Sequence, residues 1–500
     1  MGKINRTHPI PYHTALDTKL LRFSSGDTFT IRDACEGVQI FGGTGSGKSS
    51  GSGRALALAY LRAGFGGLVC CSKVNEADVW RGLAKEAGRE NHLFVIDEKA
   101  ALRFNFMDYA QATIARDGFD RNLVDMLITV SESAGSNGDS GGGGGDNQFF
   151  KDAAINMLSS AFAPIREFEG GIQLAHVYQF ITSAPASLTQ LEDKHWQERS
   201  YFYKVMTNIA VAAQHGNAVC AQICEDYGDF WYSEFPSLGD RTRSSIVATV
   251  GNTIKPFLTG AFRTLWCTRT DIVPEVCREG AIIVLDIPVR KYGKMAAIAQ
   301  QLFKLNWQIA MENTQHSDRP CFLFADESQF VMNSFDAQHL SVARSALACS
   351  VYITQDKPSY YAALGGRNAE AMADSLISKF QTRIFHANSD PVTNDYAANI
   401  CGKITQYQQT RSQSRGQTSG GSGTVNDDAN NTSGQGGDSI QDSRTISTYK
   451  DFVFQPDFFA DELRTGAKGN GYKVDAIVVR NGRNFKATGK HYLKAEFSQR

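Results

Sequence analysis

The chain has 500 residues, of which 42% are hydrophobic, and a formal net charge of −1; this length and composition are those of a globular protein with two or three domains. The near-zero charge excludes a globally basic nucleic-acid-binding protein, so any contact with DNA has to come from local clusters of Lys and Arg. No stretch is apolar over the ~18 residues that a membrane helix needs and the first residues are polar, so the sequence predicts neither a membrane span nor a signal peptide.

A phosphate-binding pattern is the first feature with a definite chemistry. It fits G-x-x-x-x-G-K-[ST] at every required position, with Gly42, Gly43, Thr44, Gly45, Ser46, Gly47, Lys48 and Ser49. In such a loop the glycines let backbone N–H groups turn towards a triphosphate, Lys48 can reach the β- and γ-phosphates, and the Ser49 hydroxyl can ligate Mg²⁺. We therefore predict that this loop, together with Ser50 after it, binds ATP and Mg²⁺.

The segments on either side of the loop predict the strand and the helix that a phosphate loop connects. Val38 to Phe41 is a short apolar run, and residues 54–62 are helix-forming residues that precede Gly64. Gly51 and Gly53 fit this pattern less well, because glycine costs about 1 kcal/mol relative to alanine inside a helix.

Alternating strand and helix patterns continue to residue 97. Strands are expected over residues 67–71 and 92–96, with a helix over residues 76–87 between them. This alternation is typical of the opening of a parallel α/β sheet.

From about Asp108 the strand patterns disappear and helical spacing takes over. Helices are expected over residues 114–130, 150–162, 172–181, 188–224 and 244–257. Residues 135–146 consist only of Gly, Ser, Asn and Asp, a composition that cannot bury enough apolar area to fold. We expect a mobile loop at that place.

The sheet pattern resumes at residues 281–287 and continues with an apolar run that begins at Cys321 and ends in Asp326 and Glu327. A central parallel strand would deliver these two carboxylates to the carboxyl edge of the sheet, where ligands bind in such folds. Asp326 is expected to hold Mg²⁺ through water, and Glu327 to orient and deprotonate the attacking water.

The last part of the chain predicts further strands over residues 350–354 and 382–386. Asp390 and Pro391 then form a typical helix start, with a capping aspartate and a proline at the first position. Residues 408–443, rich in Gly, Ser, Gln and Asn, predict a disordered linker or an exposed loop. Residues 472–480 and 483–486 flank Asn481-Gly482 and predict a hairpin that closes the sheet edge.

Ten cysteines are spread thinly along the chain, several of them in apolar runs. Such cysteines are typical of small core residues in a reducing cytosol. Cys220 and Cys224 are spaced like metal ligands but have no second pair, so the sequence favours no zinc site.

The order of these pieces resembles the type IV secretion coupling proteins of the TraG/TraD kind, within the FtsK/HerA-like group of hexameric DNA-pumping ATPases. Besides the two ATPase motifs, the resemblance rests on the strings 352–355 (Tyr-Ile-Thr-Gln), 378–385, 388–393 and 146–154. It covers most of the chain from about Val38 onward. This sequence departs from the family in two ways: it shows no pair of membrane helices, and it has Cys71-Ser72-Lys73-Val74 where members tend to have Asp-Pro-Lys-Gly.

The resemblance implies roles for two further residues. Gln355, at the end of an apolar strand, would sense the γ-phosphate or the attacking water. Arg344 lies on an expected helix and would be an arginine finger for a neighbouring subunit, a contribution worth ~10³ to 10⁵ in turnover. The alternative for Gln355 is a solvated glutamine at a strand end, and the alternative for Arg344 is an ordinary surface arginine. Arg383 is a second candidate for the arginine finger. Lys73 matches the family only by position and receives no role.

The fold that the resemblance implies is of the α/β class: a RecA-like P-loop NTPase domain with a central, mostly parallel sheet, interrupted by an all-α domain. The nucleotide-binding domain is expected over residues 1–107, with the phosphate loop, and 265–407, with the acidic strand, Gln355 and Arg344. The all-α insertion is expected over residues 108–264. A flexible low-complexity segment (408–445) and a C-terminal hairpin (446–500) complete the expected organisation.

The function that the resemblance implies is an ATP-hydrolysing coupling protein. It would deliver DNA, with an attached relaxase or other secreted protein, to the components of a type IV secretion or conjugation channel. It would act as a homo-oligomeric ring, expected to be a hexamer, with active sites between subunits. We expect a cytoplasmic protein that partners recruit to the inner face of the bacterial membrane. An ATP-gated adaptor for protein substrates and a cytosolic FtsK/HerA-like DNA translocase stay open as alternatives.

Overall fold

The computed structural model describes residues 11–113, 124, 127, 146–312, 318–333, 335–417 and 438–500. Its centre is a nine-stranded sheet with the strand order β13-β12-β9-β3-β8-β7-β4-β6-β5. The strands are β3 (Val38–Phe41), β4 (Gly66–Cys70), β5 (Leu93–Asp97), β6 (Ile282–Asp286), β7 (Cys321–Asp326), β8 (Ala348–Thr354), β9 (Thr382–Phe385), β12 (Lys473–Arg480) and β13 (Tyr492–Ser498). From β9 to β5 all neighbours are parallel.

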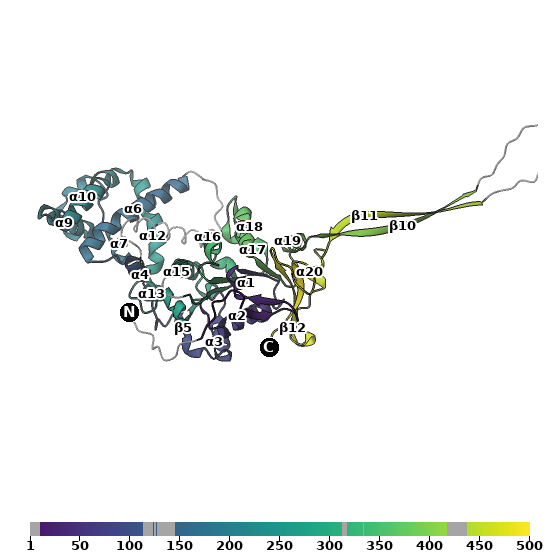
Figure 1. Cartoon of the computed structure of the whole chain (residues 1–500). Coiled ribbons are helices and arrows are strands. Elements are labelled where there is room, and N and C mark those ends of the chain that lie inside the picture. The colour runs from purple at the N-terminus through teal and green to yellow at the C-terminus, as the bar shows by residue number, and fades with distance from the viewer. Residues whose placement is uncertain are drawn as a thin grey trace, which may run out of the picture.

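Helices cover both faces of this sheet (Figure 1). On one face lie α2 (Arg54–Arg62) and α3 (Glu76–Glu86), where Trp80 stacks on Phe322 of β7 and Tyr60 contacts the same ring at a tilted angle. On the other face lies α15 (Lys294–Glu312), whose Leu302 and Phe303 are buried in a second core. Every residue of β7 is buried, as expected for a parallel strand covered on both sides.

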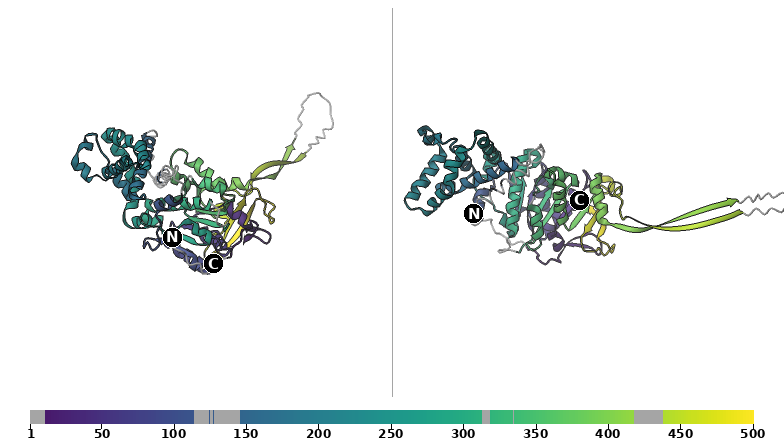
Figure 2. Two further views of the ribbon diagram at one scale, coloured as in Figure 1. Left: turned by 60° about the vertical axis from the view of Figure 1, so that its left-hand side comes forward. Right: turned by 90° about the horizontal axis from the view of Figure 1, so that it is seen from above.

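Every element that the structure describes between β5 and β6 is helical. The longer ones are α4 (Phe106–Thr113), α6 (Asp146–Glu169), α7 (Leu174–Thr182), α9 (Tyr201–Gln214), α10 (Ala218–Asp229) and α12 (Asp240–Ile254). Most of them gather beside the sheet as a separate group with Trp231 in its core (Figures 1 and 2). Of the predicted helix over residues 114–130, the structure describes only Val124 and Leu127, both helical and buried. The predicted loop over residues 135–146 lies outside the described residues except for Asp146, the first residue of α6. The predicted α/β fold with an all-α part is confirmed, whereas the exact domain boundaries stay predictions.

The helices after β7 are α16 (Phe335–Val342), α17 (Lys357–Leu364), α18 (Ala369–Lys379), α19 (Pro391–Cys401) and the short α20 (Phe458–Asp461). The predicted start of α19 is confirmed, because the Asp390 carboxylate caps the helix by accepting a hydrogen bond from Thr393 N at 2.7 Å. Before β3 the structure adds elements that were not predicted: a small hairpin of β1 (Lys19–Arg22) and β2 (Thr28–Thr30), and the helix α1 (Ile31–Cys35). None of the helices in the described ranges is long and apolar enough to cross a membrane.

The predicted C-terminal hairpin needs one correction. It closes the sheet edge as expected, but β12 pairs with β13, not with residues 483–486. The segment between the two strands is bound to the N-terminal part instead: Asp27 accepts hydrogen bonds from the backbone N–H groups of Lys486 (2.6 Å) and Ala487 (3.1 Å), and Arg483 pairs with Asp33 at 3.0 Å. These contacts hold residues 481–491 as a long connection.

The segment predicted as a disordered linker over residues 408–443 also differs. Its two ends belong to long strands, β10 (Lys403–Gln417) and β11 (Asp438–Phe452), which pair antiparallel in continuous register from Lys403↔Phe452 to Gln417↔Asp438. The pair projects from the body in every view (Figures 1 and 2). The polar composition did not predict this structure. A ribbon that packs against no other described element along most of its length needs no apolar face. Residues 418–437 lie outside the described part.

Candidate nucleotide-binding site

The phosphate loop follows β3 and is fixed by the neighbouring strands. Gly42 N donates to the carbonyl of Gln355 at 3.1 Å, and Gly43 N donates to the carbonyl of Ala387 at 2.8 Å. Gly45 and Gly47 have φ values of 78° and 86°, a region in which a side chain is strained. The loop is therefore held in its turned conformation by its glycines and by the ends of β8 and β9.

The glycines after the loop have a packing reason. Residues Ser49–Gly53 form a single π-helical turn that leads into α2, and β12 crosses close to this turn. A Cβ atom on Gly51 would lie 2.5 Å from Val474 Cγ2, and one on Gly47 would lie 2.4 Å from Val474 Cγ1. Glycine at position 51 thus permits the close approach of β12, at the cost in helix propensity that the sequence showed.

Ser49 and Asp326 meet as the sequence predicts. Ser49 Oγ donates to Asp326 Oδ2 at 2.8 Å, and both side chains come from the carboxyl edge of the sheet. A hydroxyl and a carboxylate are the oxygen donors that Mg²⁺ prefers. Lys48 is buried and its Nζ donates to Gly43 O at 3.4 Å. Burial lowers the pKa of Lys48, and the nearby carboxylates of Asp326 and Glu327 oppose this shift.

Glu327 is held in an unusual backbone conformation. Its φ of 55° places it in the left-handed region, which is rare for a residue other than glycine and clusters at functional sites. Glu327 Oε2 accepts a hydrogen bond from Gln329 Nε2 at 2.8 Å, and Oε1 accepts one from Gln355 Nε2 at 3.4 Å. Burial alone would raise the pKa of Glu327, but these bonds together with Lys73 and Lys48 lower it below the usual value. The carboxyl is therefore an ionised base near neutral pH.

Gln355 connects the parts of the site. Besides its bond to Glu327, its Oε1 accepts a hydrogen bond from Thr44 Oγ1 at 3.4 Å in the phosphate loop. Its carbonyl accepts from Asn388 Nδ2 at 2.9 Å, in the segment after β9. One side chain thus contacts the phosphate loop and Glu327, the predicted general base, as a residue that senses the nucleotide state has to do. That role stays a prediction.

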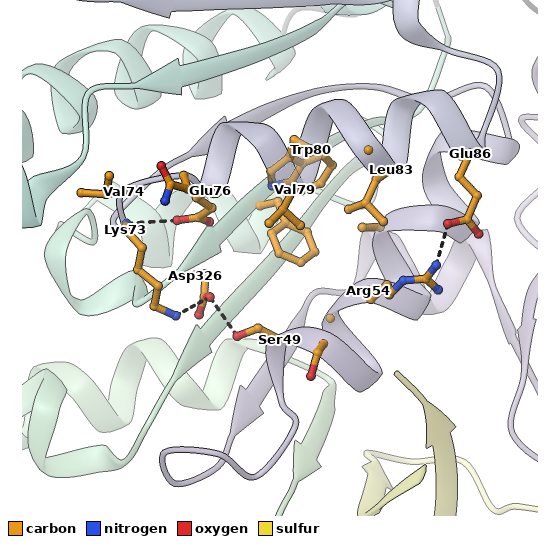
Figure 3. A pocket seen from close by; sticks show the side chains of 16 residues that line it. Ser49, Arg54, Lys73, Val74, Glu76, Val79, Trp80, Leu83, Glu86 and Asp326 are labelled. Carbon is orange, nitrogen blue, oxygen red and sulfur yellow. Dashed lines mark hydrogen bonds and ion pairs between the residues drawn. The ribbon is translucent and has the colours of Figure 1, made fainter. Parts of the chain in front are cut away.

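Lys73 is a residue of this site to which the sequence gave no role. It follows β4, which pairs with β7. Lys73 Nζ lies 2.7 Å from Asp326 Oδ2 (Figure 3). It also lies 3.4 Å from Glu327 Oε1. Burial alone would lower the pKa of Lys73, but Asp326 and Glu327 raise it, so the side chain is a cation beside the predicted metal ligands. The only signal in the sequence was its place in the string 71–74, where it matches the family by position.

A cavity of about 630 Å³ adjoins the metal side of the site, between the π-helical turn and α3 (Figure 3). Ser49, Lys73 and Asp326 lie at one end, and its wall includes Trp80 and Phe324. Glu76 lies on the same wall and its carboxylate accepts hydrogen bonds from Ser72 N (3.0 Å) and Lys73 N (3.2 Å), which fixes the turn that carries Lys73. Burial and the charge of Asp326 raise the pKa of Glu76 to about 8.

His386 lies behind the phosphate loop and was expected only as the end of a strand. Its Nε2 lies 2.7 Å from Ser52 Oγ and its Nδ1 lies 3.1 Å from the carbonyl of Asp475. Because a carbonyl only accepts, Nδ1 carries the proton and Nε2 accepts from Ser52. Burial lowers the pKa of His386 to about 4. A neutral histidine thus ties the start of α2 to β12.

The two remaining hydroxyls of the loop have different surroundings. Ser46 Oγ is buried and has no hydrogen-bond partner among the described residues, so it is a donor available to a ligand in the loop. Ser50 Oγ accepts a hydrogen bond from Gln499 Nε2 at 2.7 Å, close to the C-terminus.

The structure does not bring Arg344 to the other predicted site residues. It lies in the turn between α16 and β8, not on a helix, at the amino edge of the sheet. Its side chain is 62% exposed and pairs with Glu36 at 3.5 Å, just before β3 begins. Arg383 is buried in β9 and donates to Asn481 Oδ1 and to the carbonyls of Ile377 and Ser378. This burial removes Arg383 as a rival finger, whereas Arg344 is free to face another molecule.

The fold and the site together define a class. A phosphate loop after a central parallel strand, with Ser49, Asp326, Glu327 and Gln355 converging beside it, is the nucleotide-binding arrangement of a RecA-like P-loop NTPase.

Comparison with known proteins places this fold more narrowly. Residues 320–445 match the family model described as the TraM recognition site of TraD and TraG. The bacterial conjugative coupling protein TrwBdeltaN70, in an unbound form, has a TM-score of 0.58 at 13% identity over 97% of this chain and 92% of that chain. The plasmid coupling protein TrwB in complex with ADP and Mg²⁺ has a TM-score of 0.57 at 12% identity, over 97% and 90%. No curated protein matches the sequence. The chain has the fold of the conjugative coupling proteins, with a TraD/TraG-type segment, and the predicted resemblance is confirmed at that level.

Proposed function

We propose that this protein is an ATP-hydrolysing coupling protein that delivers DNA, with attached protein, to a type IV secretion or conjugation channel. The observation that carries the proposal is that Gln355 contacts both Thr44 and Glu327 while Ser49 reaches Asp326. The phosphate loop, the two carboxylates and the proposed sensor Gln355 would thus act as one site. Coupling proteins of the same fold have been solved with the ATP analogue ADPNP and with ADP and Mg²⁺, which supports the same ligands here.

Different residues of this chain would have different roles in phosphoryl transfer. The backbone N–H groups of the loop and Lys48 would hold the phosphates, and Ser46 would offer its free hydroxyl. Ser49 and Asp326 would hold Mg²⁺, which neutralises phosphate charge during the transfer. These residues fit that ion, because the Ser49 and Asp326 oxygens lie 2.8 Å apart, and the Lys73 ammonium shows that Asp326 already binds a cation. Glu327, kept ionised by its neighbours, would take the proton of the attacking water.

Arg344 is proposed to act on the site of a neighbouring subunit. Its own phosphate loop lies at the carboxyl end of β3, whereas Arg344 pairs with Glu36 at the amino end of that strand. A finger that serves in trans requires a ring, which we propose to be a hexamer with active sites between subunits. Formation of this ring would then be a condition for hydrolysis.

A protein partner is proposed as well as DNA. The model that matches residues 320–445 is described by its recognition of TraM, which supports contact with a protein of the relaxosome. Recruitment to the inner face of the membrane by channel components would follow from such contacts. The alternative of an ATP-gated adaptor keeps the protein partner but predicts hydrolysis that is indifferent to DNA.

The test is steady-state ATP hydrolysis against protein concentration, with and without single- and double-stranded DNA, and with Glu327→Gln as the blank. A motor that assembles into a ring gives turnover that rises cooperatively with concentration and rises again with DNA. Turnover without response to DNA would instead support the adaptor. Co-purification with a relaxase or a channel component separates secretion from DNA segregation.

A further inference from the structure

The ribbon formed by β10 and β11 is the one described element that packs along most of its length against nothing but itself. Its described side chains from Tyr407 to Gly416 and from Asp442 to Lys450 are exposed on both faces. At ~3.4 Å per residue the 15-residue strands span roughly 50 Å. A two-stranded ribbon alone is marginally stable in water. A partner that covers one of its faces would stabilise it.

The register gives the two faces opposite characters. Directly paired residues share a face, and residues two apart along a strand share it as well. The pairs Lys403↔Phe452, Thr405↔Lys450, Arg411↔Arg444 and Arg415↔Ile440 therefore lie on one face, with all five Lys and Arg residues of the ribbon. We call this the cationic face. The other face carries the pairs Gln406↔Tyr449, Gln408↔Ser447, Thr410↔Thr445 and Ser412↔Ser443.

The cationic face keeps a positive charge after its internal pairs are counted. Among the described side chains the register places one aspartate there, Asp442, so the five cations leave a net charge of +4. The Arg411 guanidinium binds Asp442 through Nε at 2.9 Å and Nη2 at 2.6 Å. Arg411 and Arg444 lie directly opposite each other, an arrangement that is unfavourable unless an anion lies between or above them.

The spacing of these charges indicates an extended polyanion. From Lys403 to Arg415 the cations are spread over roughly 40 Å, at ~3.4 Å per residue, which is too long for a nucleotide or an isolated phosphate. Tyr407 lies between them, on the same face, and is 75% exposed. A two-stranded ribbon is narrow enough to enter the ~12 Å major groove of B-DNA. Side chains of Arg, Lys and Tyr are those that contact phosphate and sugar.

We propose that the cationic face of the β10–β11 ribbon binds double-stranded DNA through its phosphates. The inference deepens the proposed function: the sequence as a whole is nearly neutral, and this face supplies the local cluster that contact with DNA requires. The contact lies outside the nucleotide site, so it serves to hold the polymer beside the motor rather than to move it.

The test compares two triple variants in the full chain. Arg411→Gln, Arg415→Gln and Arg444→Gln remove charge from the cationic face, whereas Lys99→Gln, Lys194→Gln and Lys379→Gln remove the same charge from exposed sites on the body. Affinity for a 30-base-pair duplex is measured by fluorescence anisotropy at several salt concentrations, without nucleotide. Circular dichroism checks that both variants fold.

The ribbon variant should bind the duplex on the order of tenfold more weakly, with the slope of log affinity against log salt reduced by about 1 or more per lost contact. The body variant should bind like the unmodified chain. Equal affinity of all three proteins would overturn the proposal. So would a ribbon variant that keeps its DNA affinity but loses self-association or binding to an acidic peptide, since the face would then contact protein.

The two proposals can fail separately. If DNA affinity depends on the ribbon but ATP hydrolysis does not respond to DNA, the proposed motor function is contradicted and the proposed DNA-binding face is supported. If the ribbon variant keeps its affinity for DNA and DNA still stimulates its ATP hydrolysis fully, the proposed motor function stands and the proposed DNA-binding face is contradicted.

A third triple variant, Gln408→Ala, Thr410→Ala and Thr445→Ala, tests the opposite face. A loss of affinity there equal to that of the ribbon variant would contradict the assignment to one face.

Discussion

Lys73 Nζ lies 2.7 Å from the same Asp326 Oδ2 atom that accepts the Ser49 hydroxyl at 2.8 Å. The Lys73 ammonium thus shares this oxygen with Ser49, from a turn after β4 that precedes Asp326 by more than two hundred residues in the chain. Any divalent ion that uses this oxygen has to compete with Lys73. The pair therefore sets how readily the site accepts a metal ion before the nucleotide arrives.

Lys73→Ala should make the nucleotide-free chain bind Mn²⁺, as a spectroscopic substitute for Mg²⁺, about tenfold more tightly, a change of ~1.4 kcal/mol. This modest value takes account of the 35% exposure of the Lys73 side chain and the screening that follows from it. The measurement is a titration followed by electron paramagnetic resonance. Lys85→Ala, on the exposed side of α3, is the matched control. Unchanged or weaker Mn²⁺ binding in Lys73→Ala would show that Lys73 does not compete with the metal.

Glu327→Gln should lower ATP turnover by ~10² to 10⁴, the usual contribution of a general base, and leave ATP affinity close to that of the unmodified chain. The amide is nearly the same size, and its oxygen can keep one of the two hydrogen bonds that Glu327 accepts from Gln329 and Gln355. Binding of a fluorescent ATP analogue and steady-state hydrolysis separate the two effects. Because its neighbours lower the pKa of Glu327, the acid limb of the pH–rate profile should lie below the ordinary glutamate pKa. Unchanged turnover in Glu327→Gln would contradict the assignment of Glu327 as the general base.

Gly51→Ala should destabilise the protein by ~1 to 3 kcal/mol through overpacking, since the new Cβ would lie 2.5 Å from Val474 Cγ2. In a Val474→Ala background the same change should instead be neutral or stabilising, because the clash is gone and alanine favours the helix. Gly82→Ala in α3 is the control: nothing lies within 4 Å of its Cβ position, so a gain of up to ~1 kcal/mol is expected. Urea unfolding measures all four. A destabilisation by Gly51→Ala that Val474→Ala does not reduce contradicts the packing reason.

The sequence predicted the sheet well because its strands carry two strong signals. Continuous apolar runs such as Cys321–Ala325 are typical of parallel strands buried on both faces, and the phosphate loop fixes the direction of the chain at Gly42–Ser49. The predicted parallel strands lie within a few residues of those found, whereas the second strand of the C-terminal hairpin lies further along the chain. The carboxyl ends of parallel strands share an edge, so Ser49 and Asp326 could be brought together without any coordinates.

What the sequence did not predict depends on contacts between distant segments. Lys73 belongs to the site only because β4 pairs with β7, and the pairing order of a sheet is not written in local patterns. His386 became part of the loop's support through Asp475 in β12. The β10–β11 ribbon was missed for another reason: its residues were weighed by composition, whereas its structure lies in cross-strand pairing.

The free energy of unfolding should fall in acid because of His386. Its folded pKa is about 4, below the ~6.5 of an unfolded histidine, so the unfolded state binds more protons between these values and stability rises with pH there. The contribution is complete above pH ~6.5 and is lost as the pH falls towards 4. Between pH 7 and 5 this single group should account for roughly 2 kcal/mol of lost stability.

The measurement is the difference in free energy of unfolding between pH 7 and 5, taken for the unmodified chain and for His386→Gln. The variant should show the smaller pH dependence, whatever its stability at pH 7. His195→Gln, at an exposed position in α8 (Lys194–Arg199), is the control and should leave the dependence unchanged. Equal pH dependence in His386→Gln and the unmodified chain would mean that this histidine is not held neutral.

Arg344→Ala should give an inactive chain that a second inactive chain can rescue. Arg344 lies at the opposite edge of the sheet from its own phosphate loop, so a role in hydrolysis requires the site of a neighbour. In a mixture with Glu327→Gln, an interface that receives Arg344 from the second variant and Glu327 from the first is complete. Turnover should therefore appear on mixing and peak near equal amounts. It should reach about a quarter of the unmodified rate if subunits mix at random and interfaces act independently. Arg62→Ala, an exposed arginine of α2 paired with Glu86, should stay active alone. An absence of rescue at every ratio would argue that Arg344 is a surface residue paired with Glu36 and no finger.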